Sequence, residues 1–400
     1  MRSTVPPLLD CGGGGGGDDD DRRKDLSSSV YWWRSRAEFD DRGRPEVFAS
    51  RTSAGLTPRL RVVWELERLA VVAHESLDNL RHKLLTYRAG DLWFPTGGIP
   101  KQETEIPPVI TILLLGFAGS GKSSLINLMY SVFGRSGFVP FAHTASPAGK
   151  DGRTQYLEEH NVLRSMRNGF CVFDSRGLDY DLVAEGLVEV AEWMEDGVRH
   201  RQPCRGAALP EPVSAGPSSV SSSATAAAKR FVRRRVNCAM VVADLSELHR
   251  SLVSGDLRRL EATRKLFHSL SINNHCNESP ILVLTHGDEL TAEERIETRV
   301  RVCDYLGVSE TAGVYDVVCV NEHGLLVDEM DPVIAYAVAE AVYRAVLLAD
   351  KGHPSKPNIK DWLILVLSWS MCTLAAFLAF LSACCSKIAK ASREKKFRQQ

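Results

Sequence analysis

The chain has 400 residues, enough for two to three domains of about 150 residues each. Its 49 basic and 50 acidic residues leave a net charge of -1, without the excess of Lys and Arg that nucleic-acid binding requires, so we expect no nucleic-acid partner. Ten cysteines without a CxxC spacing argue against a disulfide scaffold and a structural zinc site, and the first residues lack the apolar core of a secretion signal.

Residues 1–56 are predicted to form a disordered head. Their glycine, aspartate and serine runs cannot bury enough apolar surface to offset the loss of chain entropy on folding. Tyr31, Trp32 and Trp33 are the exception, and two interpretations stay open. The cluster is either incidental or a short docking element.

From Thr57 to about Arg88, apolar residues recur at steps of three and four, which predicts an amphipathic helix. Our interpretation is a helix packed on the following domain, and the alternative is a dimerisation or partner helix. A Pro/Gly linker follows over residues 95–106, so we assign 57–106 as helix and linker.

Residues 107–350 alternate short apolar strands with amphipathic helices. This pattern predicts an α/β domain with a mostly parallel six-stranded sheet and helices on both faces. The predicted strands are 109–115, 155–164, 169–174, 236–244, 280–285 and 314–320. The predicted helices are 121–133, 179–196, 256–270, 291–307 and 331–349. The second and third strands must be antiparallel because only a short turn joins them, and the low-complexity insertion 200–230 is predicted to be a mobile surface loop.

The chain runs from Trp362 to Ser386 without a charged residue. As a helix, residues 362–385 would extend about 36 Å, enough to cross a hydrocarbon core of roughly 30 Å. We therefore predict a transmembrane tail anchor at 362–385, followed by a basic tail at 386–400.

The segment Gly116-Phe-Ala-Gly-Ser-Gly-Lys-Ser123 fits the phosphate-binding pattern GxxxxGK[ST] between a predicted strand and helix. Its glycines let backbone amides surround phosphates, Lys122 is expected to reach the β- and γ-phosphates, and the Ser123 hydroxyl to bind Mg²⁺. The predicted nucleotide-binding residues of this loop are Gly116, Ala118, Gly119, Ser120, Gly121, Lys122, Ser123 and Ser124.

A second motif, Asp174-Ser-Arg-Gly177, follows the third predicted strand. An Asp at the end of a strand beside a phosphate-binding loop is expected to hold Mg²⁺ through water, and the Gly177 amide to sense the γ-phosphate.

The fifth predicted strand runs into Thr285-His-Gly-Asp288, which occupies the place of the guanine-recognition box [NT]KxD. The Asp288 carboxylate would accept two hydrogen bonds from guanine, a pair that adenine cannot offer. Thr285 stands for Asn, and the ring of His286, in place of Lys, is expected to stack on the purine. An Asp that only caps a helix is the alternative. Asn321, after the last strand, stands where a loop backbone would touch the base.

The order of these motifs over residues 107–350 resembles the Ras-like translation-factor class of P-loop GTPases. Within it, the His in the base box and the C-terminal anchor are similar to the septin-related branch, which includes chloroplast outer-envelope translocon receptors and immune-associated nucleotide-binding GTPases. The whole chain looks closest to plant P-loop nucleoside triphosphate hydrolases of uncharacterised role with an anchored tail. This resemblance implies GTP/GDP binding, Mg²⁺ dependence and nucleotide-dependent dimerisation.

In this class a threonine before the second strand completes the Mg²⁺ shell, and the candidates are Thr154, which we prefer, and Thr144. The predicted catalytic residues are then Lys122, Thr154 and Gly177, and the metal ligands are Ser123, Thr154 and Asp174. Leu178 stands where many Ras-like GTPases carry a water-orienting Gln. We expect slow intrinsic hydrolysis that depends on a dimer partner or an activating protein to place the water.

These features predict a single-pass, tail-anchored GTPase with its catalytic domain in the cytosol, acting as a nucleotide switch or receptor at an organelle surface. The basic tail slightly favours a mitochondrial or plastid outer membrane over the endoplasmic reticulum. Two alternatives stay open: an ATP-using P-loop NTPase, and a membrane scaffold that binds nucleotide without a hydrolysis cycle.

Overall fold

A computed structural model describes residues 32–33, 56–95, 100–134, 141–142, 154–163, 169–205, 231–276, 279–318, 331–354, 356 and 359–397. The chain divides into two units, Met1–Phe94 with Pro107–Gly352, and Pro95–Ile106 with His353–Gln400. Several predictions fall outside the described residues: most of the head, residues 206–230 of the insertion, the end of the basic tail, Thr144 and Asn321.

In the described part of the first unit, seven strands form a mixed sheet in the order β4-β2-β3-β1-β5-β6-β7. The strands are β1 (Ile110–Leu115), β2 (Tyr156–His160), β3 (Phe170–Asp174), β4 (Gln202–Pro203), β5 (Cys238–Asp244), β6 (Ile281–Thr285) and β7 (Val314–Asp316). The five strands from β3 to β7 in this order run parallel, whereas β2 is antiparallel to both β3 and β4. All six predicted strands and the antiparallel β2–β3 pair are confirmed.

The prediction of six strands was one strand short. β4 pairs Gln202 and Pro203 with Leu157 and Tyr156, inside the segment that was assigned to a mobile loop from residue 200. A two-residue strand is too short to show a period of two, so the sequence carries no strand signal there.

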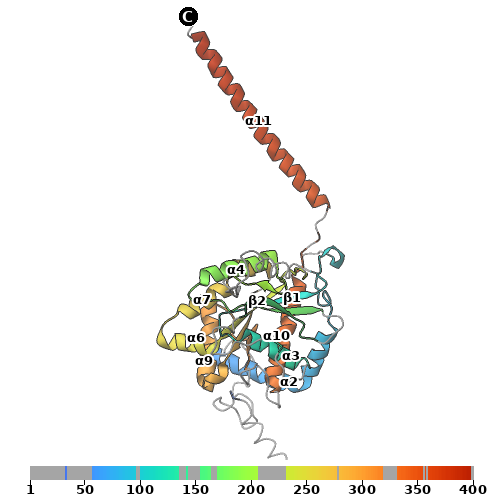
Figure 1. The fold of residues 1–400 in the computed structure, drawn as a ribbon, viewed down its shortest axis with the longest axis vertical. Helices are drawn as coiled ribbons and strands as arrows, with labels where there is room; N and C mark the ends of the chain where they lie inside the picture. The colour runs from blue at the N-terminus through green and yellow to red at the C-terminus, as the bar shows by residue number, and fades with distance from the viewer. Residues whose placement is uncertain are drawn as a thin grey trace, which may run out of the picture. The chain divides into compact units, whose positions relative to one another are not determined.

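Helices cover both faces of the sheet (Figure 1). One face packs against α2 (Pro58–Thr86), α3 (Lys122–Val132) and α10 (Pro332–Lys351), and the other against α4 (Val183–Asp196), α6 (Leu245–Ser254), α7 (Arg258–Phe267) and α8 (Leu270–His275). Helix α9 (Ala292–Leu306) contributes to both cores. Along β1, Ile112 and Leu114 enter the first core and Leu113 and Leu115 the second, as the alternation of side chains along a strand requires.

Two helices were not predicted. Helix α6 follows β5 without a break, since Asp244 ends the strand and its side chain accepts a hydrogen bond from the Glu247 amide as the helix N-cap. The predicted helix 256–270 is α7, which ends at Phe267, and α8 forms separately after Ser269.

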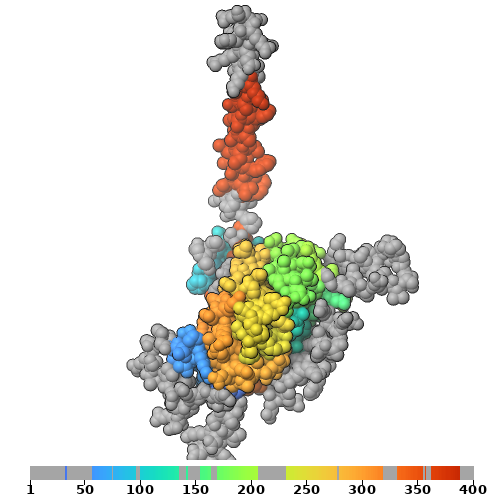
Figure 2. All heavy atoms as spheres, turned by 90° about the vertical axis from the view of Figure 1, so that its left-hand side faces the viewer, coloured from blue at the N-terminus to red at the C-terminus, as the bar shows by residue number. Residues whose placement is uncertain are grey.

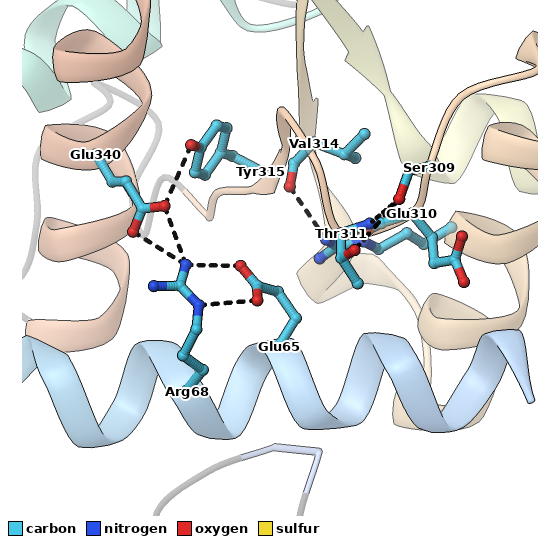
Figure 3. A network of polar contacts seen from close by, with 9 residues as sticks. Glu65, Arg68, Ser309, Glu310, Thr311, Val314, Tyr315 and Glu340 are labelled. Carbon is cyan, nitrogen blue, oxygen red and sulfur yellow. Dashed lines mark hydrogen bonds and ion pairs between the residues drawn. The ribbon is translucent and has the colours of Figure 1, made fainter. Parts of the chain in front are cut away.

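Helix α2 packs into the first core, with Val62, Leu66 and Leu84 at most 4% exposed, in agreement with the packed interpretation. Figure 3 shows how a polar network ties it to α10: the Arg68 guanidinium donates to both carboxylate oxygens of Glu65 at 2.7–2.8 Å and to Glu340 at 3.0–3.1 Å. The start of α2 lies against α9, as Figure 2 shows from outside.

In the second unit, a 3-10 turn (Lys101–Glu103) bonds to residues after α10, with the Glu105 amide 2.8 Å from the Pro354 carbonyl. The long helix α11 spans Ile359–Phe397. Among the described residues, two helices are long and apolar enough to cross a membrane. They are α10, which is mostly buried, and the segment Trp362–Lys387. The most apolar 18-residue stretch of that segment has no buried residue and a mean hydropathy of 2.2.

Candidate nucleotide site

The phosphate-binding pattern forms a tight loop between β1 and α3. A Cβ atom on Gly116 would collide with the Val242 carbonyl oxygen of β5, so only glycine fits this close approach. Gly119 and Gly121 have φ angles of +83° and +80°, in the left-handed region, and Gly121 is the N-cap of α3. The first amides of a helix have no intrahelical partner, so this loop presents donors suited to an anion.

Lys122 is buried and folds back over the loop. Its ammonium donates to the carbonyl oxygens of Gly116 at 3.1 Å and Phe117 at 3.0 Å, and to the hydroxyl of Ser120 at 3.3 Å. Burial lowers the pKa of Lys122 to about 8, and the Asp174 carboxylate opposes that shift. A phosphate oxygen is a stronger acceptor than these carbonyls, so the ammonium is placed to exchange them for an anionic ligand.

Ser123 and Asp174 meet at the base of this loop. The Ser123 hydroxyl, at the start of α3, donates to Oδ2 of Asp174, at the end of β3, over 2.6 Å. Asp174 is 1% exposed, and its other oxygen, Oδ1, is buried without a hydrogen-bond partner in the described part of the chain. Burial raises the pKa of Asp174, although the Ser123 hydroxyl and the Lys122 charge lower it.

These two oxygen donors suit a magnesium ion. Mg²⁺ prefers hard oxygen ligands and keeps several of its waters, and a buried, unpaired carboxylate oxygen is the group that such a hydrated cation would satisfy. Ser123 and Asp174 therefore fit the predicted Mg²⁺ site. Thr154 lies two residues before β2 and is half-buried, and within the described residues it makes no hydrogen bond to either of them.

The Asp174–Gly177 motif lies directly against the phosphate-binding loop. The Ala118 amide donates to the Leu178 carbonyl at 2.8 Å, and the Leu178 amide donates to the Gly116 carbonyl at 3.0 Å. A Cβ on Gly177 would stand 2.5 Å from the Ala118 Cα. Leu178 itself is 1% exposed, packed in the second core.

The base box borders the other end of the loop. Thr285 is buried, and its hydroxyl donates to the Ser120 carbonyl at 3.0 Å. His286 has a φ of +53°, and a Cβ on Gly121 would stand 3.5 Å from its Cε1. Asp288 is exposed on a 3-10 turn (Gly287–Glu289) whose first residue, Gly287, is buried. The phosphate loop and the base box are thus neighbours, as expected for one nucleotide site.

Asp244 is a residue of this site that the motifs did not reveal. Its carboxylate lies 3.0 Å from Nδ1 of His286, and this hydrogen bond raises the pKa of the imidazole. Asp244 ends β5 opposite Thr285 of β6 in the parallel register. The only sequence signal was an acidic residue at the end of an apolar strand.

Ser124, the last residue predicted for the loop, is half-buried on α3. The structure therefore brings together the predicted residues of the loop, Asp174, Gly177, Thr285 and His286, leaves Asp288 on an adjoining turn, and does not connect Thr154 to them.

Comparison with known proteins gives little to set beside this geometry. No protein-family model matches the chain, and no curated protein matches it. Among solved structures, 54 chains match. One is a chain of the signal recognition particle receptor SRb-GTP/SRX complex from Chaetomium thermophilum, which is 14% identical, covers 53% of this chain and 90% of its own length, and has a TM-score of 0.26.

Proposed function

We propose that the chain is a membrane-anchored P-loop GTPase of the Ras-like class, with slow intrinsic hydrolysis, that acts as a nucleotide switch or receptor at an organelle surface. One observation carries this proposal: Lys122, Ser123 and Asp174 converge from α3 and β3 on the glycine loop, and one buried Asp174 oxygen has no hydrogen-bond partner among the described residues. The shared neighbourhood of this loop and the base box supports a nucleotide as the ligand.

Each residue then has a defined task. The loop amides and Lys122 would bind the phosphates, and Ser123 and Asp174 would hold Mg²⁺, which when bound neutralises charge on the phosphate oxygens. Asp288 would select guanine, and Thr285 fixes the box to the loop through Ser120. His286, held by Asp244, would lie beside the purine rather than move freely over it.

The leucine at position 178 supports the proposal that intrinsic hydrolysis is slow. Its side chain is buried and has no hydrogen-bonding group, so it cannot orient a water molecule. We propose that a second copy of the chain or an activating protein supplies the missing group, and that Thr154 joins the Mg²⁺ shell in the triphosphate state.

Calorimetry of the full-length chain in detergent with Mg²⁺ and GTP, GDP, ATP or xanthosine triphosphate tests the proposal. We expect binding of GTP and GDP but not ATP, and loss of binding in Lys122→Ala. Asp288→Asn should weaken GTP by at least about ten-fold and improve the xanthosine nucleotide, because the Asn amide donates to the oxygen that xanthine carries where guanine has its amine.

Each alternative has its own outcome. Equal affinity for ATP and GTP, unchanged by Asp288→Asn, would favour an ATP-using enzyme. Turnover of GTP in the same sample above about one per second, within the range of good kinases, would contradict slow intrinsic hydrolysis. Nucleotide binding without any turnover, even at high protein concentration, would favour the scaffold.

A further inference from the structure

A buried ion pair packs against the turn of the base box. Arg295 of α9 donates from two nitrogens to the two carboxylate oxygens of Asp316, at the end of β7, both at 2.7 Å. The side chains are 6% and 1% exposed. A Cβ on Gly287 would collide with Nε of Arg295 and stand 3.0 Å from Oδ1 of Asp316. The backbone immediately before Asp288 therefore rests on this pair.

The N-terminal segment covers the same guanidinium. The Cζ atom of Arg295 lies 3.9 Å from the ring centroid of Trp32, within the range of a cation–π contact. Trp32 in turn meets Trp33 edge-on, with ring centroids 5.6 Å apart. Trp32 and Trp33, the two described residues of the predicted aromatic cluster, thus pack on their own domain.

Trp33 anchors this contact in the first core. It is 1% exposed, and its indole N–H donates to Glu67 of α2 at 2.5 Å. The start of α2 also approaches α9 through the Arg59–Glu293 ion pair at 3.2 Å. Two described residues of the head therefore connect α2, α9 and the turn that carries Asp288.

We infer that Trp32 and Arg295 are positioning residues for base recognition: the docked tryptophan holds Arg295 on Asp316, and this pair fixes the Gly287–Glu289 turn. Asp288 and Glu289 of this short turn are exposed, so ordering the turn in advance reduces the entropy lost when a base binds. The effect on guanine affinity rests on the proposed function, whereas the effect on the turn does not. Because linkage is reciprocal, bound nucleotide would also strengthen docking of the tryptophans.

Hydrogen exchange of the full-length, nucleotide-free chain tests the contact directly. Trp32→Ala should speed amide exchange in the peptide covering residues 286–290 by at least about five-fold, without changing the peptide that covers β1. Trp32→Phe keeps an aromatic face over Arg295 and should restore slow exchange. Arg301→Ala, which removes an exposed ion pair with Glu297 on the same helix, is the matched control and should have no effect.

Titration with GTP and ATP of the same four proteins then separates the two proposals. We expect Trp32→Ala to weaken GTP by at least about five-fold and Trp32→Phe to bind like the wild type. If the wild type binds no guanine nucleotide, the proposed function fails, but the exchange result still decides whether Trp32 holds the turn. Unchanged exchange in Trp32→Ala, or faster exchange with unchanged GTP affinity, would overturn the positioning role.

Discussion

Lys122 and Asp174 place opposite charges in the protein interior, beside the loop that would hold phosphate. Burial lowers the pKa of the lysine and raises that of the aspartate, and each charge offsets part of the cost of the other. Phosphate and Mg²⁺ would supply stronger partners for both groups. At this scale, ligand binding would recover the free energy that burial costs these two side chains.

The pH dependence of stability measures this cost for Lys122. Its pKa is about 8 in the folded chain and 10.5 as the ordinary value, so between these pH values the unfolded chain binds more protons. The free energy of unfolding of the wild type, relative to Lys122→Met, should therefore rise with pH, by about 1–2 kcal/mol from roughly pH 7.5 to 9.5. Urea titrations of both nucleotide-free proteins give the difference, in which the titratable groups that do not interact with Lys122 cancel. A difference that is flat or falls with pH would contradict the lowered pKa.

The residues of the site differ in how readily the sequence predicts them. Lys122 and Ser123 stand at fixed spacing within eight residues, and Asp174 ends a buried strand, so local pattern was sufficient. Asp244 reaches His286 only because β5 and β6 are parallel neighbours, and strand order is not a local property. Trp33 belongs to the core although its flanking sequence reads as a disordered head, since two aromatic residues carry too little pattern to place them.

At the scale of elements, the most constrained junction is between the phosphate loop and the segment after β3. Two backbone hydrogen bonds join them, and Phe117 stacks on Tyr180 at 4.1 Å between ring centroids. The Cζ atom of Arg259, on α7, lies 5.1 Å from the centroid of the Tyr180 ring. The junction therefore connects the site to the helices of the second face. A rearrangement of either segment must move the other.

Gly177→Ala tests this junction. The added Cβ would stand 2.5 Å from the Ala118 Cα and would push the segment away from the loop. We expect GTP affinity in calorimetry to fall by about ten-fold or more. The control is Gly255→Ala, at a left-handed position after α6 with nothing within 4 Å, which should cost about 1 kcal/mol of stability and leave affinity unchanged. Equal affinity in both variants would show that this close packing does not matter for binding.

Periodicity predicted most elements because the strands are buried runs and the helices have one apolar face. It missed α6, since Asp244 ends β5 and caps the helix with no turn residue between them. It also missed β4, whose two residues extend the sheet only through pairing with β2. β4 depends on pairing with a distant strand, whereas α6 begins at a local N-cap without a turn signal, and neither changes the placement of the site.

At the scale of the whole molecule, burial separates two helices that composition alone does not. α10 and the segment Trp362–Lys387 both pass the length and apolarity of a membrane span. In α10 the apolar residues, such as Val338, Val342 and Val346, are at most 1% exposed against the sheet and α2. In α11 the large apolar side chains are exposed along the helix: Trp362 near its start and Phe380 further along are each 64% exposed. Apolar area of this extent costs free energy in water, and the exposed helix α11 is compatible with a membrane anchor.

The last prediction follows from this difference. Wild-type chain expressed in cells should remain with membranes after alkaline carbonate extraction. The double variant Met371→Arg with Leu374→Arg should be released, because each charge near the middle of a span costs about 2.5–3.5 kcal/mol on insertion. Leu363→Arg, at the end of the span, is the matched control and should stay bound, since a long basic side chain there can reach the interface. Extraction of the wild type itself would show that α11 is not inserted, and retention of the double variant would show that insertion of α11 is not what holds the chain on the membrane.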